Sequence, residues 1–137
     1  MRIRFALPKD LNSCRKLDRD LKPVQLKKKI AAKEVVVALV ADEVVGYLRI
    51  EWFWLKIPYL TWIYVEPAYR ENEIAIEMLT FLRGKLKAQG KKILLSSYQD
   101  NASLAKRWHR KAGFKKCGKI NSINADGSTE IFCHLPC

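Results

Sequence analysis

The sequence predicts a single α+β domain built around a mixed, mostly antiparallel sheet of about seven strands and four helices. Three observations lead to this fold class. The chain has 137 residues, which is the size of one ordinary domain. Hydrophobic residues make up 49% and charged residues 29%, as in a globular protein. Segments rich in β-branched residues are interspersed with segments of helical period, without a repeat or a linker. We therefore expect one domain over residues 1–137.

The first half of the chain is expected to hold two short helices and a three-stranded meander. The expected elements are a strand at 2–6, helices that begin near Asp10 and Pro23, and strands at 35–41, 44–54 and 59–65. Asp42 and Glu43 form the turn between the first two strands of the meander. Gly46 lies early in the second of them, where it indicates a bulge or close packing.

The second half alternates between helices and strands. The expected elements are a helix at 75–86, a strand at 92–97, a helix at 103–112, and strands at 114–121 and 129–135. A strand, a long helix and another strand form a crossover unit, and the two strands of such a unit run parallel. We therefore expect the strand at 59–65 to lie parallel to the strand at 92–97.

The composition restricts the class of protein. The formal charge is +12, from 26 basic and 14 acidic side chains, which favours an anionic partner or reflects a solvated, lysine-rich surface. The longest apolar runs, 35–41 and 50–55, are far shorter than the ~20 residues of a membrane-spanning helix. The amino terminus lacks the apolar region of a signal peptide. We expect a cytoplasmic protein, no membrane contact, and ordinary thiols rather than a metal site at Cys14, Cys117, Cys133 and Cys137.

One candidate site is the segment from Tyr64 to Ala75. A strand ends before Pro67, and a short polar loop then leads into an amphipathic helix. Such a junction directs unpaired backbone N–H groups and the helix dipole at one point, which favours phosphate binding. Arg70 at the entrance of the loop adds a charged contact. A plain connection between a strand and a helix is the alternative.

A second segment, from Asn101 to Phe114, completes a resemblance. It places an asparagine at a helix start, His109 within the last two turns, and Gly113-Phe114 at the exit. Together with the loop, this segment resembles the GNAT superfamily of N-acetyltransferases. The family loop reads Arg/Gln-x-x-Gly-x-Gly/Ala, and its amides hold the pyrophosphate of coenzyme A. The aligned residues here are Arg70, Glu71, Asn72, Glu73, Ile74 and Ala75.

The resemblance implies a reaction and a set of roles. It implies acetyl-CoA as cosubstrate, an amine that attacks the thioester directly in a ternary complex, and a splayed gap between the fourth and fifth strands for pantetheine. The implied cofactor contacts are the backbone of Ile63, Tyr64 and Val65 and the side chain of Asn101. His109 takes the position of the general acid. Glu51 and Glu66 are the candidates for a general base that acts through water.

Glu73 departs from the family pattern because it replaces the first glycine of the loop. Glycine lets a backbone approach a diphosphate without a Cβ, whereas glutamate adds bulk and a negative charge. A side chain that points to solvent would leave the amide free to bind; otherwise the cofactor is held weakly or not at all. A module that keeps the fold without turnover is therefore a competing interpretation.

The acceptor amine is left open by the sequence. Four aromatic residues, Trp52, Trp54, Tyr59 and Trp62, fall on two short strands. They line an acceptor pocket, pack in the core or form a homodimer surface, and the sequence leaves these three alternatives open. The charge also admits a nucleic-acid-binding domain, but the basic residues are spread along the chain and no nucleic-acid motif is recognised, which disfavours that interpretation.

Overall fold

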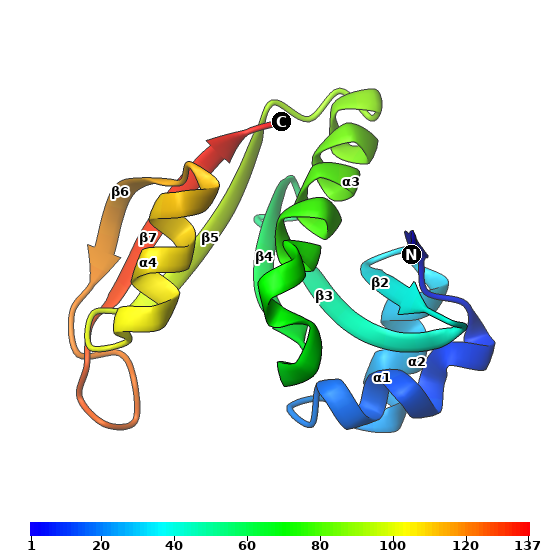
Figure 1. The fold of residues 1–137 in the computed structure, drawn as a ribbon. Coiled ribbons are helices and arrows are strands. Elements are labelled where there is room, and N and C mark those ends of the chain that lie inside the picture. The colour runs from blue at the N-terminus through cyan, green and yellow to red at the C-terminus, as the bar shows by residue number, and fades with distance from the viewer.

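The computed structural model contains one seven-stranded sheet in the order β1-β2-β3-β4-β5-β7-β6 (Figure 1). Every neighbouring pair is antiparallel except β4 and β5. The strands are β1 Arg2–Phe5, β2 Val35–Val40, β3 Glu43–Phe53, β4 Ile57–Val65, β5 Ile93–Gln99, β6 Lys115–Ile120 and β7 Glu130–Pro136. The predicted fold class, the antiparallel meander and the parallel pair are confirmed. The structure describes residues 1–70 and 73–137, and the side chains of Glu71 and Asn72 lie outside that description.

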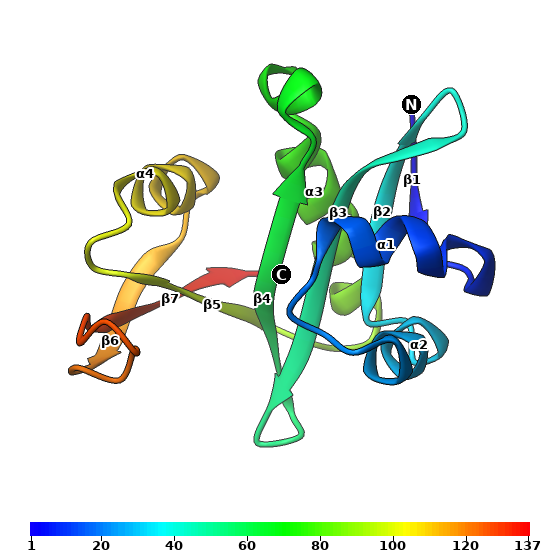
Figure 2. The same cartoon turned by 90° about the horizontal axis from the view of Figure 1, so that it is seen from below.

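Four α-helices and two short 3-10 helices cover the sheet. They are α1 Leu11–Leu17, α2 Pro23–Ala31, α3 Ile74–Ala88, α4 Ser103–Ala112, η1 Pro8–Asp10 and η2 Pro67–Asn72. Figure 2 shows α1 and α3 on opposite sides of β3. No helix among the described residues is long and apolar enough to cross a membrane.

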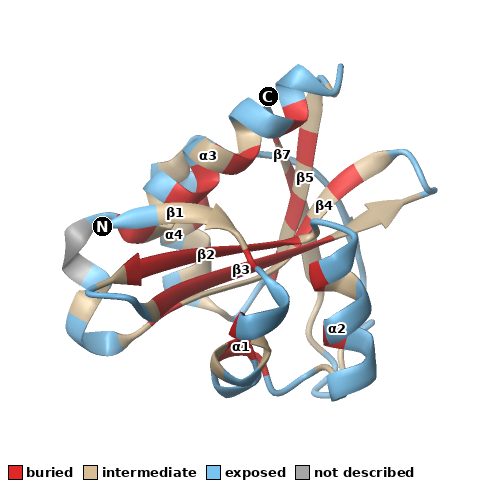
Figure 3. Ribbon diagram, turned by 90° about the vertical axis from the view of Figure 1, so that its right-hand side faces the viewer, coloured by how far each residue is buried: buried red, intermediate tan, exposed pale blue. Residues whose placement is uncertain are grey.

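Two hydrophobic clusters hold the layers together. One fills the space between α3 and the sheet, and it includes Leu48, Met78 and Leu94. The other packs α1 and α2 on the opposite face, around Leu26 and Tyr47. Figure 3 shows that most of β2 and the adjoining part of β3 are buried, as expected of strands covered on both faces. The helices are thus held against the sheet by the burial of apolar surface.

Gly46 allows α3 to approach the sheet closely. A Cβ at this position would lie 3.1 Å from side-chain atoms of Ala38, Ile74 and Met78. The register of β2 and β3 also shifts at this point, where Ala38 pairs with Gly46 and Leu39 pairs with Val44. Both predictions for Gly46, a bulge and close packing, are therefore confirmed.

The parallel pairing of β4 and β5 is short. It is limited to Tyr59 with Leu95 and Leu60 with Ser96. One residue later β4 contains a bulge, because Arg49 pairs with Trp62 while the next residue of β3 pairs with Leu60. A bulge bends its strand and increases the local twist. Beyond it the two strands diverge, so the carboxyl-terminal part of β4 has no strand partner on its β5 side (Figures 1 and 2).

The turn between β3 and β4 has an unusual conformation. The sequence predicted it at residues 56–58, whereas the structure places it earlier, at Trp54 and Leu55, with φ of 54° and 61°. The loop comprises residues 54–56, since Phe53 pairs with Ile57, and two consecutive left-handed residues are normally asparagine or glycine. Both side chains are exposed, so packing does not explain the choice of residues.

Candidate active site

A cavity opens where β4 extends past its pairing with β5. Its volume is about 380 Å³, and it lies between β4, the start of α3 and one face of α4. The lining residues are Ile63, Tyr64, Val65, Arg70, Ala75, Leu104, Ala105, Trp108 and His109. Because β4 has no strand partner here, the backbone polar groups on this edge face the cavity. The walls combine apolar side chains with a few polar groups, as in small-molecule sites.

The amino terminus of α3 forms one end of this cavity. Glu73 occupies the N-cap position with φ of 58°, and among the described residues no side chain caps the helix. The first helical hydrogen bond runs from the N–H of Glu77 to the carbonyl of Glu73, at 3.1 Å. The N–H groups of the first turn therefore have no intrahelical acceptor, and together with the helix dipole they favour an anion.

The side chain of Glu73 forms an ion pair with α4. It is mostly exposed, and its Oε1 lies 3.3 Å from the Nζ of Lys111 on α4. The left-handed backbone conformation at Glu73 explains why glycine suits this position, and it costs a non-glycine residue about 1 kcal/mol. The carboxylate of Glu73 is therefore partnered by a cation of α4.

Arg70 is held at the same end of the cavity. Its Nε donates a hydrogen bond of 2.8 Å to the carbonyl of Val65, and its guanidinium lies 5.2 Å from the ring centre of Tyr64. These two contacts leave the outer nitrogens of the guanidinium directed away from the strand. Arg70 can thus donate a charge-assisted hydrogen bond to a phosphate while it keeps its contacts with Val65 and Tyr64.

His109 is buried between α4 and β5, and both of its ring nitrogens are bonded within the protein. Nδ1 lies 2.7 Å from the carbonyl of Ala105, which can only accept, so Nδ1 carries the proton. Nε2 lies 2.8 Å from the Oγ of Ser96, and in the neutral ring Nε2 accepts from this hydroxyl. Burial lowers the pKa of His109 and favours the neutral form. Ser96 also contacts the carbonyl of Leu60, at the last paired position of β4 and β5.

This burial makes stability depend on pH. The folded-state pKa of His109 lies below that of the unfolded chain, so the unfolded state binds more protons once the pH falls below about 6.5. We expect wild-type stability to fall between pH 7 and pH 5, by at most about 1.4 kcal/mol per pH unit. His109→Gln should be less stable at pH 7 but show a flatter profile. Urea unfolding at several pH values tests this, and equal slopes in the two proteins would contradict it.

Trp108 provides an unpaired donor beside His109. Its Nε1 is buried and has no hydrogen-bond partner among the described residues. The indole lines the cavity, and its ring centre lies 4.9 Å from that of His109. A buried donor without an acceptor costs free energy. An acceptor brought by a ligand would remove that cost, so this atom fits a site that holds a polar ligand.

Comparison with known proteins identifies the fold and the family. The family model described as "Acetyltransferase (GNAT) domain" matches residues 31–116, which is more than half of the chain. The chain belongs to the GNAT acetyltransferase family. No curated protein matches the sequence significantly.

Solved structures agree with this membership at low sequence identity. The ribosomal-protein-alanine N-acetyltransferase from Brucella melitensis is 18% identical, covers 100% of both chains and has a TM-score of 0.85. Similar values hold for yncA from Salmonella typhimurium with its cofactor acetyl-CoA, at 17% identity, 99% and 93% coverage and a TM-score of 0.81. An aminoglycoside 6'-N-acetyltransferase complexed with coenzyme A is 16% identical, covers 99% of this chain and 97% of its own, and has a TM-score of 0.82. At such identities these likenesses establish the GNAT fold alone.

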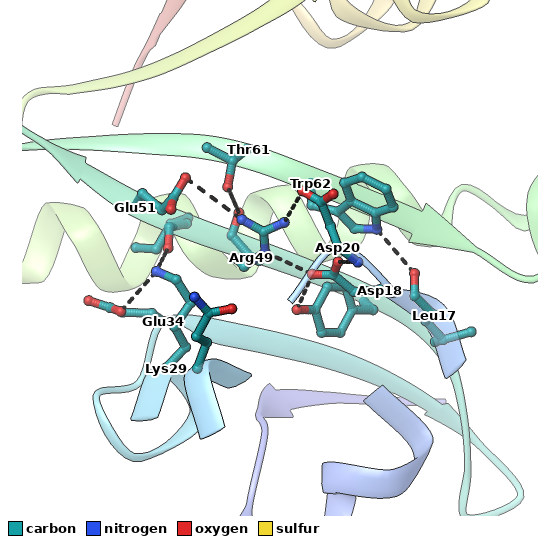
Figure 4. Close-up of polar contacts among 12 residues, drawn as sticks. Leu17, Asp18, Asp20, Lys29, Glu34, Arg49, Glu51, Thr61 and Trp62 are labelled. Carbon is teal, nitrogen blue, oxygen red and sulfur yellow. Dashed lines mark hydrogen bonds and ion pairs between the residues drawn. The ribbon is translucent and has the colours of Figure 1, made fainter. Parts of the chain in front are cut away.

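The opposite face of the GNAT sheet carries a buried charge network around Arg49 (Figure 4). The Nε of Arg49 donates to Asp18 at 2.7 Å, and the hydroxyl of Tyr47 donates to the same carboxylate, also at 2.7 Å. Glu51, the predicted base, lies on this face with its Oε2 3.7 Å from an outer nitrogen of Arg49. Glu51 is about half exposed and is therefore reachable by an acceptor from this side.

A second polar network on this face was not predicted from the sequence. The hydroxyls of Tyr59 and Ser97 lie 2.5 Å apart, and Ser97 donates to Glu130 at 2.6 Å. Asn124 donates to the other oxygen of Glu130. Burial raises the pKa of Tyr59. The network joins β4, β5 and β7 beside the point of divergence. Alternation assigns side chains to faces only within one strand, so it could not bring Tyr59 and Ser97 together.

The remaining predicted site residues lie apart from the cavity. Glu66 lines a separate cavity next to α1, together with Ser13 and Lys16. Asn101 donates to Asp126 at 3.1 Å in the loop before β7, because α4 begins two residues later than Asn101. The predicted cofactor contacts Glu71 and Asn72 lie outside the described residues. The cavity contacts that the site prediction left out are Leu104, Ala105 and Trp108, although their helical spacing had placed them on one face.

Proposed function

We propose that this protein is an acetyl-CoA-dependent N-acetyltransferase that acts on a primary amine by direct attack in a ternary complex. The observation that carries the proposal is the cavity where β4 leaves β5, with unpaired strand backbone on one wall and an uncapped helix amino terminus at its end. The residues present fit coenzyme A. Apolar walls and the unpaired Nε1 of Trp108 suit a pantetheine arm, and α3 with Arg70 suits a diphosphate.

The cofactor contacts follow from this placement. The amides of Glu73, Ile74 and Ala75 and the guanidinium of Arg70 hold the diphosphate, and Glu71 and Asn72 complete the same loop. The backbone of Ile63, Tyr64 and Val65 pairs with the pantetheine arm as a fifth strand would. Asn101 joins this set by exchanging its contact with Asp126 for a contact with the arm.

The chemistry requires an activated acetyl group, which acetyl-CoA supplies as a thioester. A backbone N–H of the unpaired segment at 63–65 donates to the carbonyl oxygen and stabilises the charge that develops there. One such preorganised donor contributes about 3 kcal/mol. The amine approaches from the face that carries Arg49 and Glu51, so the two substrates meet between the diverging strands.

Proton transfer is assigned to His109 and to a carboxylate on the acceptor face. Glu51 or Glu66 takes the proton of the incoming ammonium through water. Once the nitrogen has bonded to the carbonyl carbon, the Nε2 of His109 accepts the second proton of that nitrogen through the hydroxyl of Ser96, and the imidazolium gives a proton to the sulfur as the carbon–sulfur bond breaks. A lowered pKa makes that imidazolium a stronger acid, which suits protonation of a thiolate.

Calorimetry with coenzyme A, followed by acetylation of a panel of primary amines, tests the proposal. Binding together with transfer of the acetyl group supports it. The second candidate function, a GNAT-fold module without turnover, is favoured by the carboxylate of Glu73 near a diphosphate. Absence of heat at millimolar coenzyme A would discard the transferase and leave that second function.

Glu73→Gly should bind coenzyme A more tightly than the wild type. The change removes a negative charge near the diphosphate and relieves the left-handed strain. It also releases the ammonium of Lys111 to face the cofactor. We expect the dissociation constant to fall about fivefold, which corresponds to roughly 1 kcal/mol less charge repulsion, whereas the relief of strain stabilises the free and the bound protein alike. Glu77→Gln, one turn further along the helix, is the control and should change affinity less. Weaker binding by Glu73→Gly would show that the glutamate is no obstacle.

A further inference from the structure

The turn between β3 and β4 exposes two large apolar side chains to solvent. Trp54 is 76% exposed and Leu55 is 91% exposed. Neither residue belongs to the two hydrophobic clusters that the described part of the chain forms. Figures 2 and 3 show this hairpin projecting beyond the neighbouring elements, which agrees with the exposure of the two side chains. We call residues 53–57 the hairpin tip.

The backbone of the hairpin tip is strained. The N–H of Lys56 donates to the carbonyl of Phe53 at 3.1 Å and closes the turn, in which Trp54 and Leu55 both have positive φ. A bulky residue in the left-handed region is an outlier, whereas asparagine and glycine adopt that region readily. Such outliers are typical of functional positions. The residue types and their conformation together indicate that the two exposed side chains serve a contact outside the chain.

Lysines surround the base of the hairpin tip. Lys56 lies in the turn itself, and the Nζ of Lys91 lies 5.2 Å from the ring centre of Trp52, on the strand that leads into the turn. The Nε1 of Trp52 also donates to Glu34 at 2.9 Å, which places the loop between α2 and β2 at the same end of the sheet. Four lysines of these segments form no ion pair among the described residues, namely Lys33, Lys56, Lys91 and Lys92. The apolar tip therefore has unpaired positive charge around it.

This combination fits an anionic lipid surface better than a protein partner. A standard protein interface buries about 800 Å² on each partner, with closely matching shapes. The hairpin tip offers only two fully accessible apolar side chains on a projecting turn. A bilayer accepts an apolar group without a matching shape, and tryptophan favours its interfacial region. Each lysine near an anionic leaflet strengthens binding about fivefold.

We propose that the hairpin tip attaches the protein to the surface of an anionic bilayer. Trp54 and Leu55 enter the boundary between headgroups and acyl chains, and the lysines at the base contact lipid phosphates. An interfacial contact of this kind needs no spanning segment, so it replaces the sequence-based expectation of no membrane contact. The candidate cofactor cavity lies at the other end of β4, about 25 Å along the strand (Figure 2). The proposal therefore does not depend on the proposed function.

Co-sedimentation with vesicles of phosphatidylcholine and phosphatidylserine tests the role of the apolar side chains. Trp54→Asn/Leu55→Gly should bind these vesicles at least tenfold more weakly than the wild type, since it removes the groups that insert. The same variant should unfold at a higher urea concentration, because asparagine and glycine suit the left-handed turn. The control, Val24→Ser/Ile123→Ser, removes exposed apolar side chains from α2 and from the loop between β6 and β7, and it should bind as the wild type does.

The charge of the bilayer and of the lysines is tested in the same assay. The wild type should bind vesicles of phosphatidylcholine alone at least tenfold more weakly than vesicles that also contain phosphatidylserine. Lys56→Glu/Lys92→Glu should lose about 25-fold in affinity for the anionic vesicles, because each lysine contributes about fivefold. Lys115→Glu/Lys119→Glu makes the same change in net charge on β6, at the far edge of the sheet, and should lose much less.

The bilayer proposal has clear contrary results. Equal binding of the wild type to both kinds of vesicle, or binding to neither, overturns it. Undiminished binding by Trp54→Asn/Leu55→Gly does so as well, as does an equal loss in the two lysine variants. Dimerisation of the wild type that the tip variant abolishes, without binding to vesicles, assigns the hairpin tip to a second copy of the chain and rejects the bilayer. Coenzyme A binding, measured without vesicles, reports separately on the proposed function.

Discussion

Asp18→Ala should lower the free energy of unfolding by about 3–5 kcal/mol, because removal of one partner leaves a buried charge uncompensated. The side chain of Asp18 is 0% exposed, and that of Arg49 is 4% exposed. Asp18 accepts hydrogen bonds from both Arg49 and Tyr47, so the change strands a guanidinium and a hydroxyl at once. A domain of this size has a stability of about 5–15 kcal/mol, and the variant would lose a large share of it. Urea unfolding monitored by circular dichroism measures the loss.

Asp20→Ala is the matched control for this prediction. Asp20 faces the same guanidinium, but at 3.7 Å and from an exposed position. Exposed ion pairs contribute about 0–1 kcal/mol, so this variant should remain close to the wild type. A similar small loss in both variants would show that the network around Arg49 does not anchor the loop between α1 and α2.

Ala75→Glu should weaken coenzyme A binding about a hundredfold while it leaves the fold intact or slightly more stable. Ala75 lies in the first turn of α3 and lines the cavity. A carboxylate there satisfies the free N–H groups and interacts favourably with the helix dipole, which adds about 0.3–1 kcal/mol to stability. The same carboxylate occupies the anion site and repels a diphosphate. Opposite effects on stability and binding distinguish this mechanism from simple damage to the fold.

Ala88→Glu, at the other end of the same helix, provides the comparison. Ala88 is exposed and far along α3 from the cavity. A negative charge at a helix carboxyl terminus is mildly unfavourable, so stability should fall slightly while coenzyme A affinity stays unchanged. Thermal unfolding measures the stability of both variants, and calorimetry measures their affinity for coenzyme A. Undiminished affinity in Ala75→Glu would mean that the diphosphate binds elsewhere.

The architecture could be predicted from the sequence because local patterns determine it. The run at 35–40 is buried on both faces, and the run at 93–98 buries every second residue. The order strand, helix α3, strand requires a crossover between parallel strands. The position of the β3–β4 turn could not be predicted. Trp54 and Leu55 adopt a left-handed conformation that their residue types do not signal.

The site was predictable only in part. The segment at 63–65, Arg70 and Ala75 line one cavity with His109, as their place at the junction of strand and helix indicated. The hydrogen bonds of His109 to Ala105 and Ser96 depend on the exact rotation of α4 against β5, which no local pattern specifies. The burial of Arg49 depends on Asp18, which is 31 residues away in the chain.

An amide-resolved NMR titration with coenzyme A tests the central claim, that the diphosphate binds the uncapped start of α3 and the pantetheine arm pairs with β4. We expect the largest shifts at the amides of Ile74 and Ala75 and in the segment 63–65, with a change at the indole N–H of Trp108. Shifts confined to α1, or none at millimolar coenzyme A, would contradict it.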